Sequence, residues 1–132
     1  MDSLVIVDAA NVVGSVPDGW WRDRRGAAER LRDALVGHAG TGLPGLVDPP
    51  LELVLVVEGA ARGVASVPGV RVVSADGSGD DTMVRLVAEE GAGRDCLVVT
   101  ADRGLRERVQ ALGAHVTGPR TVWGGRGRGG VS

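Results

Sequence analysis

The chain has 132 residues and a formal net charge of −2, a length that suits one domain burying about two-thirds of its unfolded surface. It contains no Lys, which excludes a P-loop and Schiff-base catalysis because both need a lysine side chain. With so little net charge, any affinity for nucleic acid has to come from local groups of Arg.

The sequence shows no sign of secretion or of membrane insertion. The single Cys96 cannot form an internal disulfide. The apolar run at residues 4–7 is far too short for a signal peptide, and no stretch approaches the ~20 apolar residues of a membrane helix. We therefore expect a cytoplasmic protein that does not associate with membranes.

Five short runs of Val, Leu and Ile predict β-strands. In chain order they lie at residues 4–7, 53–57, 70–73, 97–100 and, more weakly, 115–117. Each run is almost continuously apolar, which is typical of strands that are buried on both faces. The sequence therefore predicts a central, mostly parallel sheet of four or five strands.

Three amphipathic stripes between these runs predict helices that cover the sheet. Their apolar members are Ala28, Leu31 and Leu35, then Met83, Val84 and Val87, and finally Leu105, Val109 and Leu112. Strands that alternate with helices form βαβ units. We predict an α/β fold, a three-layer α/β/α sandwich of Rossmann-like type. Residues 1–119 would form this domain, with a loop at 40–50, and residues 120–132 a flexible tail rich in Gly and Arg.

Acidic residues follow the predicted strands. Asp8 comes directly after the first strand, Glu58 directly after the second, and Asp102 shortly after the fourth. The neighbours Asp80 and Asp81 lie where the second helix should begin. The carboxyl ends of parallel strands share one edge, and right-handed crossovers bring the helix start to it. We therefore expect these acids to lie close together.

Each acid also has an explanation that involves no ligand. Asp102, or one of Asp80 and Asp81, could cap the helix that follows it, and Glu58 could be an ordinary acid at a strand end. A group of acids is harder to explain, because two carboxylates ~4 Å apart repel by about 4 kcal/mol at an effective dielectric near 20. Such a group needs protonation, an Arg partner or a metal ion. Carboxylate oxygens suit Mg²⁺ or Mn²⁺, and such an ion beside phosphates suggests phosphodiester hydrolysis.

Three segments resemble the acidic motifs of NYN domains in the PIN-like nuclease superfamily. They are Val-Asp-Ala-Ala-Asn at residues 7–11, Gly-Asp-Asp-Thr at residues 79–82 and Val-Thr-Ala-Asp-Arg at residues 99–103. In order and spacing, residues 3–117 are most similar to the small bacterial YacP-like branch. The resemblance implies an α/β/α sandwich with a central parallel sheet, RNA as the substrate and metal-dependent ribonuclease activity.

The resemblance also implies roles for individual residues. The catalytic set is Asp8, Asn11, Asp81 and Asp102, and the metal ligands come from Asp8, Asp80, Asp81 and Asp102, with Glu58 as an additional candidate. Asp81 fits the family motif slightly better than Asp80. Asn11 is expected to orient a water, the scissile phosphate or Asp8, while Thr100 and Ser78 support the site by hydrogen bonding. Glu58 departs from the family pattern, because no recognisable motif follows it.

Trp and Arg side chains near these motifs are candidates for RNA binding. Trp21 could stack on a base, while Arg22, Arg25 and Arg103 could contact phosphates. Alternatively, a Trp of the pair at residues 20–21 packs under a helix, and the Arg side chains form a solvated surface.

The sequence thus favours a metal-dependent endoribonuclease, in which water activated by one or two Mg²⁺ or Mn²⁺ ions attacks the phosphorus in line. A non-catalytic NYN-like module that binds RNA or a protein remains open. A small-molecule phosphohydrolase matches less well, because Ala10 stands where an Asp-x-Asp pair needs its second acid. The RNA could be single-stranded or structured. The sequence also leaves open a homodimer and an inhibitory or ribosome-associated partner.

Overall fold

The computed structural model describes residues 2–123 of the chain. Its strands are β1 (Ser3–Asp8), β2 (Leu51–Val57), β3 (Val70–Ser74), β4 (Cys96–Val99) and β5 (His115–Thr117). Its helices are α1 (Ala9–Gly14), α2 (Arg24–Thr41), α3 (Gly79–Glu90) and α4 (Arg103–Gln110), with 3-10 turns η1 (Trp20–Arg22), η2 (Gly59–Ala61) and η3 (Pro119–Thr121). All five predicted strands are present, and their ends differ from the prediction by at most two residues.

The five strands form one parallel sheet in the order β3-β2-β1-β4-β5. The chain runs outward from β1 through β2 to β3 and then returns to β4 on the other side of β1. The direction of winding therefore reverses between β1 and β4. In open α/β sheets the crevice for ligands lies at this reversal point, beyond the carboxyl ends of the strands. The predicted α/β class and parallel sheet are confirmed.

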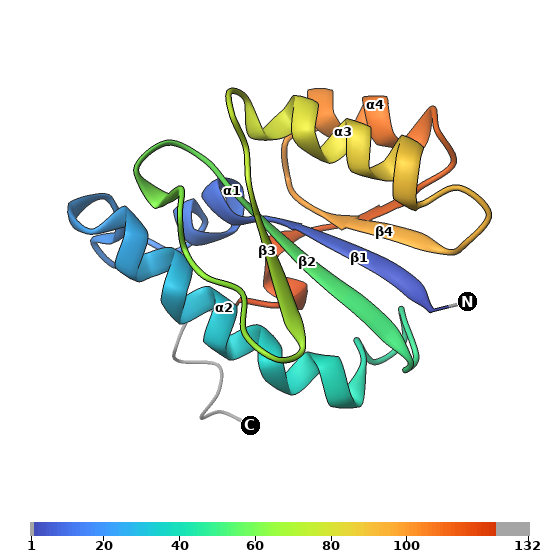
Figure 1. The fold of residues 1–132 in the computed structure, drawn as a ribbon, viewed down its shortest axis with the longest axis horizontal. Helices are drawn as coiled ribbons and strands as arrows, with labels where there is room; N and C mark the ends of the chain where they lie inside the picture. The colour runs from blue at the N-terminus through green and yellow to red at the C-terminus, as the bar shows by residue number, and fades with distance from the viewer. Residues whose placement is uncertain (1, 124–132) are drawn as a thin grey trace.

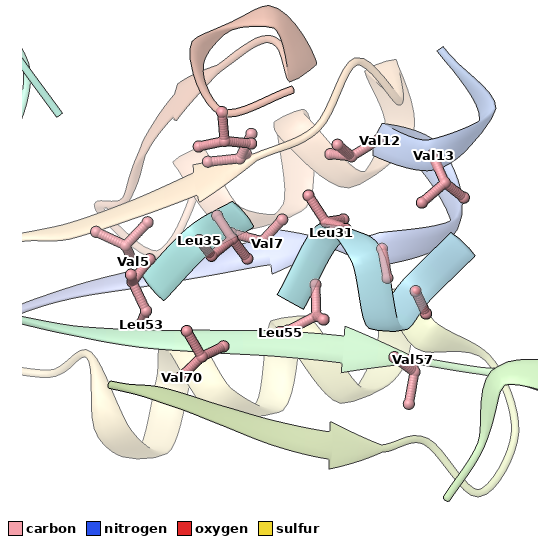
Figure 2. Close-up of a cluster of buried hydrophobic side chains, with 14 of the residues drawn as sticks. Val5, Val7, Val12, Val13, Leu31, Leu35, Leu53, Leu55, Val57 and Val70 are labelled. Carbon is pink, nitrogen blue, oxygen red and sulfur yellow. The ribbon is translucent and has the colours of Figure 1, made fainter. Parts of the chain in front are cut away.

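Helices cover both faces of the sheet (Figure 1), with α1 and α2 on one face and α3 and α4 on the other. Successive residues of a strand point to opposite faces. Val5 and Val7 of β1 pack toward α2, as Figure 2 shows, while Leu4 and Ile6 pack toward α3 and α4. All four side chains are at most 1% exposed. This double burial is the reason why the strand sequences are continuously apolar.

The long helix α2 buries the stripe that the sequence predicts. Ala28, Leu31 and Leu35 are at most 1% exposed and belong to the core beneath this helix. Asp23 begins the helix, because its carboxylate accepts a hydrogen bond of 2.9 Å from a backbone N–H in the first turn. The helix ends later than expected and includes the first two residues of the loop predicted at 40–50.

The prediction for Leu112 is wrong. Helix α4 ends at Gln110, and Leu112 is 49% exposed instead of packing beside Leu105 and Val109. The chain turns before Leu112 can reach the buried face, and Gly113 completes the turn with a φ of +93° that glycine adopts most readily. The sequence also does not predict the six-residue α1, since so short a helix carries too little periodic signal.

The packed chain continues beyond the predicted domain end at residue 119. Val122 is buried in the core beneath α2, and Trp123 packs against that core. The rest of the predicted tail, residues 124–132, lies outside the described residues. Within residues 2–123, no helix is long and apolar enough to cross a membrane.

Candidate active site

The carboxyl ends of β1, β2 and β4 bring polar side chains to the reversal point of the sheet. Asp8 ends β1, and because its neighbour Val7 pairs with Val99, Thr100 lies beside Asp8. Asp8, Glu58 and Thr100 continue the alternation of the strand residues that face α3 and α4. The strand ends and the start of α3 therefore meet on one side of the sheet.

Thr100 connects the first and third acidic motifs. Its hydroxyl donates to Asp8 Oδ2 at 2.9 Å and accepts from the Asp102 N–H at 3.1 Å. Asp8 Oδ1 accepts from the Asn11 N–H at 3.4 Å, so Asp8 also caps α1. Thr100 is fully buried. It forms the kind of hydrogen bonds predicted for it, and its effect on catalysis stays a prediction.

The Asn11 side chain holds the turn that precedes Asp102. Its Oδ1 accepts from the Ala101 N–H at 2.8 Å, which joins the first motif to the third. The side-chain oxygen is therefore used for positioning Asp102 rather than for orienting Asp8. The amide nitrogen of Asn11 carries two further donors, which leaves the predicted contact with a water or a phosphate open.

Glu58 and the start of α3 are held together by a backbone contact. The Gly79 N–H donates to Glu58 Oε1 at 2.9 Å, and a Cβ atom at Gly79 would collide with the same carboxylate. Ser78 caps α3 by accepting from the Asp80 N–H at 3.1 Å. Because Ser78 is the cap, the capping explanation does not apply to Asp80 or Asp81.

Burial and mutual repulsion raise the pKa values of two carboxyl groups in the site. Asp8 is 5% exposed, and burial is the main cause that raises its pKa to about 6. Its two hydrogen bonds oppose this shift, while the charges of Asp80 and Glu58 add to it. The pKa of Asp80 is raised by burial first and then by the charges of Asp102 and Glu58. These four carboxylates therefore act on one another.

Asp81 lies outside this group. Its side chain is 73% exposed and accepts a hydrogen bond of 3.1 Å from Arg108 of α4. Successive helical residues point about 100° apart, and of these two neighbours it is Asp80 whose pKa is raised by the charges of Asp102 and Glu58. The geometry therefore does not support the slight preference of the motif for Asp81, nor a place for Asp81 in the catalytic set.

Asp102 has the capping role that the sequence allowed. Its Oδ1 accepts from the Leu105 N–H at 2.9 Å and so begins α4. A carboxylate can accept about four hydrogen bonds, and Oδ2 forms none with the residues that the structure describes. Capping and metal binding are therefore compatible for Asp102.

The acids Asp8, Glu58, Asp80 and Asp102 have the chemistry of a site for a hard divalent cation. Their donors are all carboxylate oxygens, and none of them forms a salt bridge within residues 2–123. In the described part of the chain, no three His, Cys, Asp or Glu side chains lie close enough together to hold an ion as they stand. The donor set fits Mg²⁺ or Mn²⁺ by type and charge, and the carboxylates would have to draw together around the ion.

The side chains predicted to bind RNA differ in their availability. Trp21 is 51% exposed, and the Arg22 guanidinium lies 5.7 Å from the centre of its ring. Arg103 is exposed beside Asp102. Arg25 instead donates to two consecutive backbone carbonyls after η2, at 2.8 and 3.1 Å. The prediction that Arg25 contacts phosphate is therefore not supported, because its terminal nitrogens hold this loop.

Gly79 is a residue of the site that sequence reasoning overlooks. A Cβ at this position would have to displace the Glu58 carboxylate, which approaches the Gly79 backbone from 21 residues away in the chain. The available signal is that glycine stands on both sides of the capping Ser78. By itself, this Gly-Ser-Gly pattern predicts only a flexible turn.

The layers and the strand order define a three-layer α/β domain with an all-parallel sheet, and acidic side chains gather at its carboxyl edge. Among solved structures, the chain is similar to Rae1 (YacP) from Bacillus subtilis in a mutant form, with a TM-score of 0.71. The sequences are 16% identical, and the match covers 92% of this chain and 72% of that chain. No family model and no curated protein matches the sequence. At this identity the likeness shows the fold, and the resemblance to the YacP-like branch is confirmed at that level.

Proposed function

We propose that the chain is a metal-dependent endoribonuclease. The observation that carries the proposal is the convergence of Asp8, Glu58, Asp80 and Asp102 at the reversal point of the sheet. Burial of Asp8 and repulsion within the group make these charges costly without a cation. The likeness in fold to a YacP protein, and the resemblance of the motifs to YacP-like ribonucleases, support RNA as the substrate.

Asp8, Asp80 and Asp102 are the proposed metal ligands, with Glu58 as an additional one. A bound Mg²⁺ or Mn²⁺ supplies charge stabilisation at the scissile phosphate and lowers the pKa of the attacking water. Thr100 holds Asp8 in place against the backbone of Asp102. Because the pKa of Asp8 is about 6, its carboxyl group is mostly ionised at neutral pH and becomes protonated as the pH falls below that value, and only the ionised form can act as a ligand.

Exposed side chains on both sides of the sheet edge provide the proposed contacts with RNA. Trp21 and Arg22 belong to η1, on the side of α1, and Arg103 begins α4 on the opposite side. An exposed indole ring can stack on a base, and a guanidinium can bind a phosphate. These local groups are needed because the chain as a whole is weakly negative.

The experiment that tests this proposal is cleavage of labelled single-stranded and hairpin RNA by purified protein with Mn²⁺, with Mg²⁺ and with EDTA. We expect cleavage that requires the metal and falls roughly 100-fold or more in Asp8→Asn, Asp80→Asn and Asp102→Asn. Asp81→Asn makes the same change of charge one residue away and should keep most of the activity. Normal cleavage by Asp8→Asn, with the metal still required, would show that the site is wrongly assigned.

One observation favours a second function, an RNA-binding module without catalysis. As the side chains stand, no three acids within residues 2–123 are close enough to hold an ion. Such a module would bind RNA in the presence of Mg²⁺ without turnover, and Asp8→Asn would leave its dissociation constant unchanged. Isothermal titration calorimetry of the protein with Mn²⁺ measures whether the ion binds. It separates the two functions because only the nuclease needs a bound ion.

A further inference from the structure

Arg106 of α4 lies between the carboxyl ends of β4 and β5, next to the acidic edge. Its Nε–H donates to the backbone carbonyl of Thr100, the residue after β4, at 2.7 Å. One of its terminal nitrogens, Nη2, lies beside Gly118, the residue after β5. Arg106 is also half-buried. The fold therefore fixes the position of this guanidinium, which an exposed arginine on a helix surface would not have.

The Arg106 guanidinium keeps most of its capacity for hydrogen bonding. A guanidinium carries five N–H donors, and the contact with Thr100 uses one of them, so that four remain on the terminal nitrogens. Among residues 2–123 these nitrogens form no hydrogen bond, and Arg106 forms no salt bridge. A planar fork of donors with a fixed orientation matches the oxygens of a phosphate.

Arg106 does not neutralise Asp102, the proposed metal ligand at the start of the same helix. The two residues are four apart in the chain, a spacing at which helical side chains readily form ion pairs. The Arg106 N–H donates to the Asp102 carbonyl at 3.0 Å, but in the described part of the chain their side chains form no salt bridge. Both charges are therefore left for ligands of opposite sign, a cation at Asp102 and an anion at Arg106.

Gly118 leaves one side of this guanidinium uncovered. A Cβ atom at Gly118 would lie 3.7 Å from Nη2 of Arg106 and, apart from its chain neighbours, would meet no other atom within 4 Å. The φ of Gly118 is −83°, which residues other than glycine adopt without strain. Glycine is therefore not needed here for the backbone, and its effect is to keep the terminal nitrogens of Arg106 accessible.

We propose that Arg106 and the gap at Gly118 form a binding site for one backbone phosphate of the RNA strand. The site lies on the side of the sheet edge opposite to Trp21 and Arg22, so the strand crosses the edge from α1 to the end of β5. That the strand is a substrate rests on the proposed ribonuclease function. The contact with the phosphate can be measured without cleavage.

The first arm of the test removes the charge of Arg106. The affinity for a short labelled oligouridylate is measured by fluorescence anisotropy in EDTA at several concentrations of KCl. For a single strand, each neutralised phosphate contributes about 0.7 to the slope of log affinity against log salt concentration. Arg106→Gln should therefore reduce this slope by about 0.7 and weaken binding roughly tenfold or more.

Two further variants show whether the effect belongs to the charge at this position. Arg106→Lys keeps the charge and should keep the salt slope, although it lacks the planar fork of donors and should bind RNA more weakly than the wild type. Arg30→Gln makes the same change of charge elsewhere and should leave the slope unchanged. Arg30 is an exposed residue of α2 that forms no salt bridge within residues 2–123.

The second arm covers the guanidinium and leaves every charge in place. Gly118→Leu puts a side chain beside Nη2 of Arg106, so it should reduce the salt slope and the affinity for RNA as Arg106→Gln does. Gly37→Leu is the matched control, because Gly37 is an exposed residue of α2 where a Cβ meets no atom within 4 Å. Circular dichroism and thermal unfolding show whether the variants fold.

A wild-type salt slope in Arg106→Gln, or wild-type affinity in Gly118→Leu, overturns the proposal. So does the absence of RNA binding by the unmodified protein. An equal loss of slope in Arg106→Gln and Arg106→Lys would mean that Arg106 only supports Thr100, which rejects the phosphate site. Binding that depends on Arg106 without cleavage in Mn²⁺ would support the phosphate site and reject the ribonuclease. Metal-dependent cleavage with a slope that Arg106→Gln does not change would do the reverse.

Discussion

Thr100 is buried between two residues that have to act together. Its single hydroxyl proton is used in the hydrogen bond to Asp8, and its oxygen accepts from the backbone of Asp102. Since the donor is the hydroxyl, this arrangement favours the ionised form of Asp8, which accepts on both oxygens. The same hydrogen bond opposes the rise in the pKa of Asp8. One side chain thus influences both the position and the charge of Asp8, the principal proposed metal ligand.

Replacement of Thr100 by Val tests this connection. The Thr100→Val side chain has nearly the same shape but lacks the hydroxyl, so Asp8 and the Asp102 N–H lose their shared partner. We expect kcat/KM for RNA cleavage to fall roughly 10- to 100-fold, with a weaker apparent affinity for the metal. Thr100→Ser keeps the hydroxyl and is the control. Equal activity of the Val and Ser variants would show that the hydrogen bonds do not matter.

Ionisation of Asp8 should lower the stability of the metal-free protein. Its pKa rises from 3.8 to about 6 on folding. Between these values the folded chain keeps a proton that the unfolded chain has released, so the free energy of unfolding falls as pH rises through this range. Without metal, Asp8→Asn should therefore be more stable than the wild type at pH 7.5, by up to about 3 kcal/mol, and the gain should vanish near pH 4.

Urea denaturation of both proteins in EDTA across this pH range measures the effect. Added Mn²⁺ should raise the stability of the wild type and leave Asp8→Asn nearly unchanged, because only the folded wild type offers the complete ligand set. A stability difference between the two proteins that does not vary with pH would contradict the assigned shift.

At the scale of single elements, the start of α3 decides which acids reach the site. Ser78 caps the helix, and the Gly79 N–H is in contact with Glu58. These two contacts set the rotation of the first turn, so Asp80 faces the sheet edge and Asp81 faces Arg108. The identity of the third acid therefore depends on how the helix begins.

Gly79→Ala separates packing from helix propensity. Ala is favoured over Gly in a helix by about 1 kcal/mol, but a Cβ at this position would collide with the Glu58 carboxylate. We expect the variant to displace Glu58 and to weaken metal binding roughly tenfold, without a gain in thermal stability. Gly77→Ala is the control, because a Cβ there meets no atom within 4 Å. If both variants bind metal equally well, the contact with Glu58 is not needed for the site.

For the molecule as a whole, the sheet joins two cores that lie on its opposite faces. β1 contributes to both cores, with Val5 and Val7 on the side of α2 and Leu4 and Ile6 on the side of α3 and α4. Neither face can lose its helices without exposing strands that the other face needs. We therefore expect a single cooperative unfolding transition, as in most domains of this size.

Leu31→Ala tests the cooperativity of the two faces. Leu31 is fully buried beneath α2, so its truncation should lower the free energy of unfolding by about 2–5 kcal/mol. Val36→Ala on the same helix, where Val36 is 41% exposed, should change it by less than about 0.5 kcal/mol. Unfolding followed by tryptophan fluorescence and by far-UV circular dichroism should coincide in both variants. Separate transitions would mean that α2 can detach while the sheet persists.

Much of the fold is predictable because its physical cause is local in the sequence. A continuous apolar run such as residues 53–57 indicates burial on both faces, and the parallel sheet follows from that burial. The helical stripe at Ala28, Leu31 and Leu35 is equally local. Leu112 shows the limit of this reasoning. Its spacing from Leu105 and Val109 matches the buried face of α4, but the helix ends before it and the turn closed by Gly113 leads the chain away.

The candidate site could be predicted only in part. Asp8, Glu58 and Asp102 follow strands, and parallel strands end at a common edge, so their proximity follows from the order of elements. The distinction between Asp80 and Asp81, and the use of Arg25 to hold a loop, depend on contacts with residues far away in the chain. No spacing along the sequence contains that information.

The sequence by itself determined the α/β class, the burial of the strands and the edge at which acids gather, because these follow from hydrophobic periodicity and from the geometry of parallel strands. Only the tertiary structure decided the strand order, the rotation of α3 that selects Asp80, and the Thr100 bridge between Asp8 and Asp102. The physical reason is that hydrogen bonds, steric fit and electrostatic repulsion act between side chains within a few ångströms in space. Their separation along the chain does not reveal those distances.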